Sequence, residues 1–122
     1  MKPLPGETGA NAEEAARIYL EQQGLRLVER NYRCRQGEID LIMQDGSTLA
    51  FVEVRYRKSS GFGSPAESVT APKQRRIIAT AAHYLQSKKE RNMPPCRFDV
   101  LAIEGKEQQN IDWIKDAFQA SF

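Results

Sequence analysis

A segment in the middle of the chain, residues 48–57, contains the apolar stretch LAFVEV. Consecutive apolar residues over this length are typical of a strand that is buried on both faces, near the centre of a sheet. The segment 38–44 precedes it and is followed by Asp45 and Gly46, a pair that signals a tight hairpin turn. With a further expected strand over residues 25–33, the sequence predicts a meander of three strands.

Two other segments have the apolar periodicity of amphipathic helices. The first covers residues 11–23, and the second begins at Thr70 with Pro72 in its first turn. Residues 97–103 alternate as a fourth strand, whereas residues 111–118 are compatible with either a strand or a short helix. The order of these elements predicts an α/β protein.

The length of 122 residues and the hydrophobic content of 40% indicate one globular domain. We expect residues 1–10 to form a flexible arm and residues 11–122 to form the domain. Cys34 and Cys96 show no paired spacing, which argues against a disulfide scaffold. Because no apolar run approaches the roughly 20 residues that cross a bilayer, we expect a cytoplasmic protein without membrane contact.

Two acids lie within the apolar strand segments, Asp40 in GEIDLI and Glu53 in FVEVR. A buried carboxylate without a partner is unstable by several kcal/mol, so each acid needs compensation. Side chains alternate along a strand, so Glu53 and Arg55 share a face. If the two strands pair through the turn at Asp45, Asp40 lies close to Glu53. A divalent cation would then neutralise both acids, and hard oxygen ligands select Mg²⁺ or Mn²⁺.

An internal ion pair is the alternative to a metal. Arg55 or another arginine would neutralise Glu53, and Asp40 would bind backbone amides or a tyrosine. The helix residue Glu13, at the border of its apolar stripe, has a similar alternative, because pairing with Arg17 is the usual outcome of an i,i+4 spacing.

The net charge of +2 by itself does not indicate a nucleic-acid partner. Basic residues nevertheless gather between residues 55 and 76, where Glu67 is the only acid. They form either a solvated surface or a rim that faces phosphate. Lys73 lies one helical turn before Ile77 and is expected to point toward the sheet.

Five sequence fragments resemble the YraN family of bacterial proteins over nearly the whole chain. They are AEEAARIYL, RNYRCRQGEIDLI, LAFVEVRYRKSSGFG, SVTAPKQRR and CRFDVLAI. That family is similar to the PD-(D/E)XK nuclease superfamily, in the branch of the archaeal Holliday-junction resolvases. The resemblance implies a restriction-endonuclease-like three-layer core with a central mixed sheet in αβββαβ order, and a metal-dependent phosphodiesterase site.

Carried over by position, the resemblance assigns Asp40 and Glu53 to the metal and adds the backbone carbonyl of Val54 as a further ligand. Glu13 matches the acid that the first helix contributes in the resolvase-like branch. The cofactor would be Mg²⁺ or Mn²⁺.

Arg55 occupies the position of the superfamily's lysine. Arginine keeps its proton, so it can bind phosphate or stabilise charge but cannot act as a base. Lys73 is the candidate replacement for that lysine. The residues expected to hold the nucleic-acid backbone are Arg57, Lys58, Arg75 and Arg76.

These expectations describe a Mg²⁺- or Mn²⁺-dependent endonuclease that acts on structured or branched DNA, with a homodimer possible because paired cuts need two equivalent sites. The alternative is a catalytically inactive nucleic-acid-binding module of nuclease fold. A third alternative is a protein adaptor whose acids and bases form only internal ion pairs.

Overall fold

The computed structural model describes residues 7–57, 68–88, 93–105 and 110–120, and within these ranges the chain forms two helices and five strands. The elements follow one another as α1 (Glu7–Gln22), β1 (Arg26–Cys34), β2 (Gly37–Asp45), β3 (Thr48–Arg57), α2 (Ala71–Ser87), β4 (Cys96–Glu104) and β5 (Asn110–Phe118).

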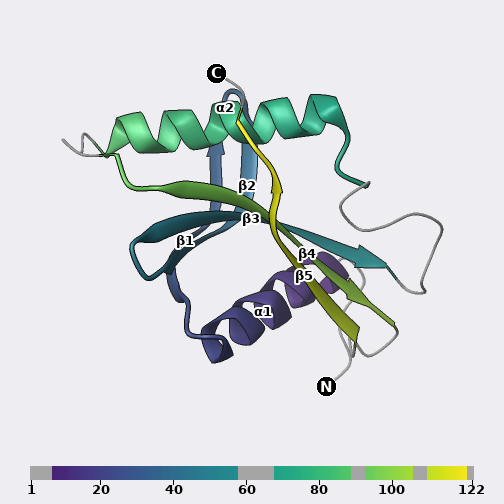
Figure 1. Ribbon diagram of the computed structural model, residues 1–122. Helices are drawn as coiled ribbons and strands as arrows, with labels where there is room; N and C mark the ends of the chain where they lie inside the picture. Colours follow the sequence, from purple (N-terminus) through teal and green to yellow (C-terminus); the bar gives the residue numbers. More distant parts are fainter. Residues whose placement is uncertain (1–6, 58–67, 89–92, 106–109, 121–122) are drawn as a thin grey trace.

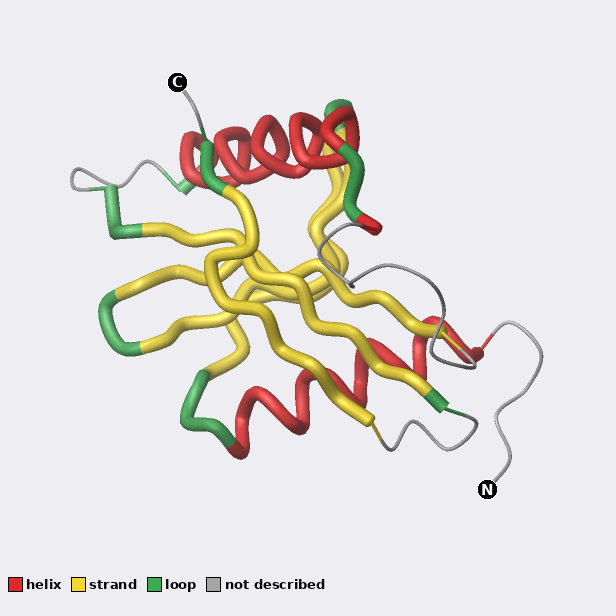
Figure 2. Tube along the Cα trace, turned by 45° about the vertical axis from the view of Figure 1, so that its right-hand side comes forward, coloured by secondary structure: helices red, strands yellow, loops and turns green. Residues whose placement is uncertain are grey.

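The strands form one mixed sheet in the order β1-β2-β3-β4-β5. Neighbours are antiparallel except β3 and β4, which are parallel and are joined through α2. Helix α1 lies on one face of the sheet and α2 on the other (Figure 1), and Figure 2 shows the same layers from a second direction. The fold is therefore mixed α/β, and its first six elements follow the expected αβββαβ order.

Strand β3 is buried on both faces, as its apolar sequence predicts. Ala50 and Val52 belong to the core cluster that α1 completes through Leu20. Phe51 faces α2, with its ring centroid 6.1 Å from that of Tyr84. Burying one large apolar side chain stabilises a fold by roughly 1.5–3 kcal/mol. Because β3 buries such side chains on both of its faces, it contributes to the packing of both helices on the sheet.

The expected elements are confirmed, with differences at the ends of the chain. Helix α1 begins at Glu7, within the segment expected to be an arm. The segment after residue 109 is a strand, because it pairs with β4 from Asn110 to Ile114 and again, after a register shift, at Phe118. In the described part of the chain, no helix has the length and hydrophobicity needed to cross a membrane.

Candidate metal centre

Asp40 and Glu53 lie on neighbouring strands where β2 and β3 separate. The paired residues of these strands end at Leu41 and Val52, so the two acids are the next residues on each strand. Asp40 Oδ2 accepts a hydrogen bond of 2.8 Å from the Val54 N–H. A side-chain oxygen of β2 thus binds β3 at a position where the pairing has ended. Both acids line the same cavity, which confirms the predicted proximity.

The backbone is also irregular on the other side of Asp40. The pairing between β1 and β2 skips the positions of Asn31 and Asp40. Asn31 has a φ of 54°, a left-handed conformation that asparagine adopts more readily than most residues. Asp40 therefore has no paired residue on either neighbouring strand, although the register of β1 and β2 is the same before and after it.

Glu53 is buried and has two cationic partners. Lys73 Nζ lies 2.7 Å from Glu53 Oε2, and Arg55 Nη1 lies 3.4 Å from the same oxygen. Lys73 reaches Glu53 from the first turn of α2, after the N-cap residue Thr70. The predicted orientation of Lys73 toward the sheet is confirmed, and so is the expected neighbourhood of Glu53 and Arg55.

A cavity of about 230 Å³ contains these groups between α2 and the start of β2. Glu38, whose carboxylate is paired with Arg33, stands at its wall. The full lining is Gly37, Glu38, Asp40, Glu53, Lys73, Arg76 and Ile77. The cavity therefore combines three carboxylates with two cationic side chains.

The environment of Asp40 disfavours its negative charge. Burial, followed by the charge of Glu53, raises the pKa of Asp40 from its ordinary value to about 8, although the Val54 amide acts in the opposite direction. Among the described residues, no lysine or arginine forms an ion pair with Asp40. Additional positive charge next to Asp40 would therefore favour the ionised carboxylate.

Glu13 of α1 is half-buried and belongs to the same electrostatic surroundings. Burial raises its pKa first, and the charges of Glu38 and Glu53 raise it further, while a hydrogen bond with Asn31 lowers it. Arg17, the alternative partner of Glu13, instead pairs with Glu14 and Glu21.

The donor set fits one hard divalent cation. Carboxylate oxygens are the ligands that Mg²⁺ and Mn²⁺ prefer, and Asp40 and Glu53 offer them in one cavity. In the ranges that the structure describes, no three His, Cys, Asp or Glu side chains are arranged to hold an ion together. Val54, expected to offer its carbonyl, contacts Asp40 through its amide.

A second buried acid, Asp99 of β4, was not singled out by the sequence patterns. It accepts hydrogen bonds from Arg97 Nε at 3.0 Å, from Trp113 Nε1 at 3.0 Å and from the Asp116 N–H at 2.9 Å. These donors compensate its charge, so Asp99 joins β4 to β5. The sequence signal that could have identified Asp99 is its position in CRFDVLAI, where it is an acid within an apolar strand.

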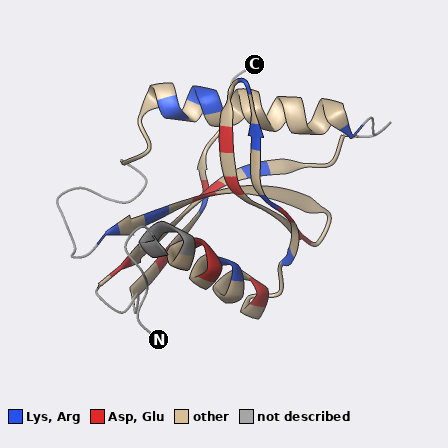
Figure 3. Cartoon of the chain, turned by 180° about the vertical axis from the view of Figure 1, so that it is seen from behind, with Lys and Arg blue, Asp and Glu red and all other residues tan. Residues whose placement is uncertain are grey.

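The basic residues expected to contact nucleic acid are distributed differently. Arg75 and Arg76 are exposed on the first half of α2. Arg57 is paired with Glu104, and Lys58 lies outside the described residues. Two further exposed arginines, Arg33 and Arg35, lie at the turn between β1 and β2. Figure 3 shows Lys and Arg both on the first half of α2 and on this hairpin.

Sequence reasoning missed the two hairpin arginines, although the basic fragment RNYRCR contains both. The contact between the hairpin and α2 depends on tertiary packing. A Cβ placed on Gly37, directly after the turn, would lie 3.6 Å from Arg76 Cβ.

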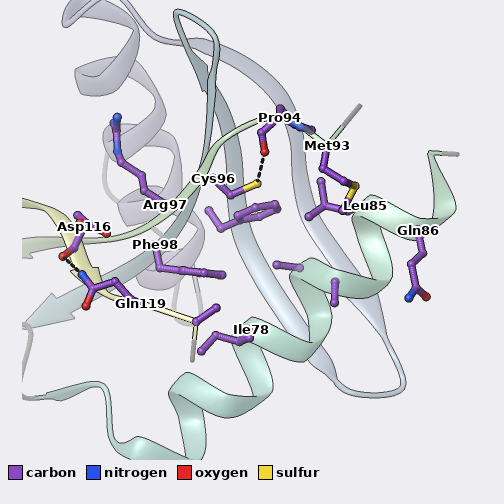
Figure 4. Close-up of a pocket in the computed structure, with 14 residues that line it drawn as sticks. Ile78, Leu85, Gln86, Met93, Pro94, Cys96, Arg97, Phe98, Asp116 and Gln119 are labelled. Carbon is purple, nitrogen blue, oxygen red and sulfur yellow. Dashed lines mark hydrogen bonds between the residues drawn. The ribbon is translucent and has the colours of Figure 1, made fainter. Parts of the chain in front are cut away.

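A larger cavity of about 440 Å³ lies between the second half of α2 and the start of β4. Figure 4 shows Ile78, Leu85 and Phe98 along its walls. The Cys96 thiol at its edge donates to the Pro94 carbonyl at 3.3 Å. The walls of this larger cavity are mainly apolar. The cavity lined by Glu38, Asp40 and Glu53, called the carboxylate cavity below, is therefore the better candidate for binding a metal or catalysing a reaction.

Residues 12–103 match the profile described as "Uncharacterised protein family UPF0102". The chain belongs to UPF0102. This membership confirms the resemblance to the YraN family, which is the same family. It covers the whole carboxylate cavity, including Asp40, Glu53 and Lys73.

Two relatives within UPF0102 illustrate how far the similarity extends. A UPF0102 protein of Nitrosomonas europaea is 51% identical over 116 residues, which cover 95% of this chain and 97% of the relative. A UPF0102 protein of Coxiella burnetii is 48% identical over 122 residues, which cover 100% of both chains. The similarity therefore includes both helices and the complete sheet.

Proposed function

We propose that this UPF0102 protein is a metal-dependent phosphodiesterase with a restriction-endonuclease-like core of the PD-(D/E)XK type, acting on structured or branched DNA. The observation that carries the proposal is the shared cavity of Asp40 and Glu53, in which Asp40 has no cationic partner among the described residues. Basic residues on the adjacent hairpin and helix favour a polyanionic substrate.

Asp40 and Glu53 are the residues that would hold Mg²⁺ or Mn²⁺. When bound, such an ion makes water more acidic and offsets the negative charge of a phosphodiester. Arg55, 3.4 Å from Glu53, remains protonated and is suited to binding a phosphate oxygen as negative charge increases. Lys73 brings a second positive group to Glu53 from α2 and takes the role that the superfamily gives to a lysine on the strand.

Glu13 does not line the cavity, and it acts on Asp40 through its charge. Arg75 and Arg76 on α2 would bind the nucleic-acid backbone, a contact that positions the substrate without reading its sequence. Paired cuts in the two strands of a junction would require a two-fold dimer.

The alternative, a nucleic-acid-binding module without hydrolytic activity, is favoured by one observation. The Lys73 ammonium already neutralises Glu53 at 2.7 Å, and Arg55 replaces the lysine that the superfamily carries at this position. In such a module, Asp40→Asn leaves the affinity for DNA unchanged or increases it, because it removes negative charge without removing a required metal.

Cleavage assays separate the two functions. Four-way junction, flap, duplex and single-stranded DNA are incubated with the protein in Mg²⁺ and in Mn²⁺. We expect cleavage of a structured substrate that decreases at least about a hundredfold in Glu53→Gln. Asp112→Asn, which changes an exposed acid on β5, should leave the rate unchanged. Binding without cleavage by the folded wild-type protein would contradict the hydrolytic proposal and support the binding module.

A further inference from the structure

The backbone of β2 approaches α2 very closely at Gly37. A Cβ placed on Gly37 would lie 3.1 Å from Thr80 Oγ1, closer than nine in ten real contacts of this kind. Gly37 is the first residue of β2 and forms part of the cavity wall. The absence of a side chain at this position therefore determines how near the strand and the helix can be.

Thr80 has little room to move away. Its side chain is fully buried, and its Oγ1 donates a hydrogen bond of 2.7 Å to the Arg76 carbonyl. A β-branched side chain in a helix also has few available rotamers. A methyl group added at Gly37 would consequently shift the start of β2 or displace α2.

Gly37 and Thr80 belong to two of the elements that line the carboxylate cavity, β2 and α2. Asp40 follows Gly37 on β2 by three residues, a distance of roughly 10 Å along a strand. Lys73 and Arg76 precede Thr80 by two turns and one turn on the same face of α2, and both line the cavity. A change in the separation at Gly37 is therefore transmitted to the groups around Glu53.

We infer that Gly37 and Thr80 are positioning residues whose contact sets the width of the carboxylate cavity and so places Lys73 against Glu53. In its relation to metal and substrate, this inference rests on the proposed function. It adds a steric contact between the β1–β2 hairpin and α2, made by two uncharged residues, that fixes the positions of the charged groups.

The test is a double-mutant cycle with Gly37→Ala, Thr80→Ala and the combined variant. Thr80→Ala removes the hydroxyl that the new methyl would meet, while the next neighbour, Arg76 Cβ, remains at 3.6 Å. Gly46→Ala is the matched control. Gly37 has a φ of 155° and Gly46, in the turn between β2 and β3, has a φ of 60°, so alanine strains the backbone at both positions. A Cβ on Gly46 would meet nothing within 4 Å, so this control shares the strain but not the contact.

Two measurements are made on each folded variant. The affinity for Mn²⁺ is measured by calorimetry, and the acetylation rate of the Lys73 amine is measured by mass spectrometry without metal. We expect Gly37→Ala to weaken Mn²⁺ binding about tenfold, because a shift at the start of β2 moves Asp40 away from Glu53 and this loss outweighs the release of Lys73 as a competing cation. Lys73 acetylation should become several-fold faster. Adding Thr80→Ala should restore most of both values, leaving the part that comes from backbone strain at Gly37, and Gly46→Ala should change neither.

The outcomes distinguish this inference from the proposed function. If Gly37→Ala changes neither measurement while the wild type binds Mn²⁺, the positioning role is wrong and the metal site stands. If Thr80→Ala restores no part of a changed value, the steric explanation is wrong. If the wild type binds no Mn²⁺ but Lys73 acetylation changes and is restored, the metal site is wrong and the positioning contact stands.

Discussion

At the scale of single residues, two aspartates of the sheet have opposite surroundings, the buried Asp99 and the half-buried Asp40. Asp99 is fully buried and accepts hydrogen bonds from the side chains of Arg97 and Trp113. Asp40 accepts one from the Val54 amide and lies beside Glu53, which raises its pKa to about 8 together with burial. An acid with several side-chain donors stabilises the fold, whereas an acid in a cavity without a cationic partner and with a strongly raised pKa is typical of a functional site.

The raised pKa of Asp40 predicts how stability depends on pH without metal. Because the folded value of about 8 is above the ordinary value, the folded state prefers the protonated carboxyl. This stabilisation is complete below about pH 4 and is lost as the pH rises through about 8. Urea unfolding in a chelator should therefore show lower stability near pH 9 than near pH 5, and Asp40→Asn should reduce the difference. Equal pH dependence in the two proteins would contradict the assignment.

At the scale of the elements, sequence patterns were sufficient to predict the meander, both helices and the meeting of Asp40 with Glu53. The alternating strand pattern and the turn at Gly46 fix that register. They could not predict the interrupted pairing at Asn31, because it depends on the backbone conformation of one residue. The sequence patterns also could not predict that the β1–β2 hairpin packs close to α2, because this contact depends on tertiary packing between distant segments.

Lys73 extends from α2 to Glu53, so its replacement should lower the stability of the protein but raise its affinity for metal. Lys73→Met leaves the buried Glu53 with Arg55 as its nearby cation, so stability should fall by about 1–2 kcal/mol, a value reduced by the partial exposure of Lys73. The affinity for Mn²⁺ should increase several-fold in calorimetry, because a competing cation is removed, and cleavage should decrease.

Lys88→Met is the control for this change. Lys88 caps the other end of α2 and contacts Glu29 at 3.8 Å near the surface, so its loss should alter neither metal affinity nor cleavage. Unchanged Mn²⁺ affinity in Lys73→Met would show that Lys73 does not compete at Glu53.

At the scale of the whole molecule, a small net charge conceals an uneven distribution. The chain has a formal charge of +2, yet exposed arginines gather on the β1–β2 turn and on the first half of α2. Folding brings the β1–β2 hairpin, whose turn carries Arg35, against α2, since a Cβ on Gly37 would lie 3.6 Å from Arg76 Cβ. Net charge alone therefore does not reveal this local concentration of arginines.

This distribution predicts different effects for two arginines of the same hairpin. Arg35→Ala should weaken DNA binding and reduce the slope of log affinity against log salt by about 1, as expected for the loss of one phosphate contact. Arg26→Ala removes an equally exposed arginine at the opposite end of β1 and should have a much smaller effect. Fluorescence anisotropy at several salt concentrations measures both, and equal losses would contradict a localised binding surface.

The most direct test of the account is calorimetric titration of Mn²⁺ into the wild type, Glu53→Ala and Asp112→Ala. If Asp40 and Glu53 together hold a hard cation, the wild type and Asp112→Ala should release the same heat with one saturable site, and Glu53→Ala should show none. Saturable binding of equal affinity in all three folded proteins, or in none of them, would contradict the carboxylate pair as a metal centre.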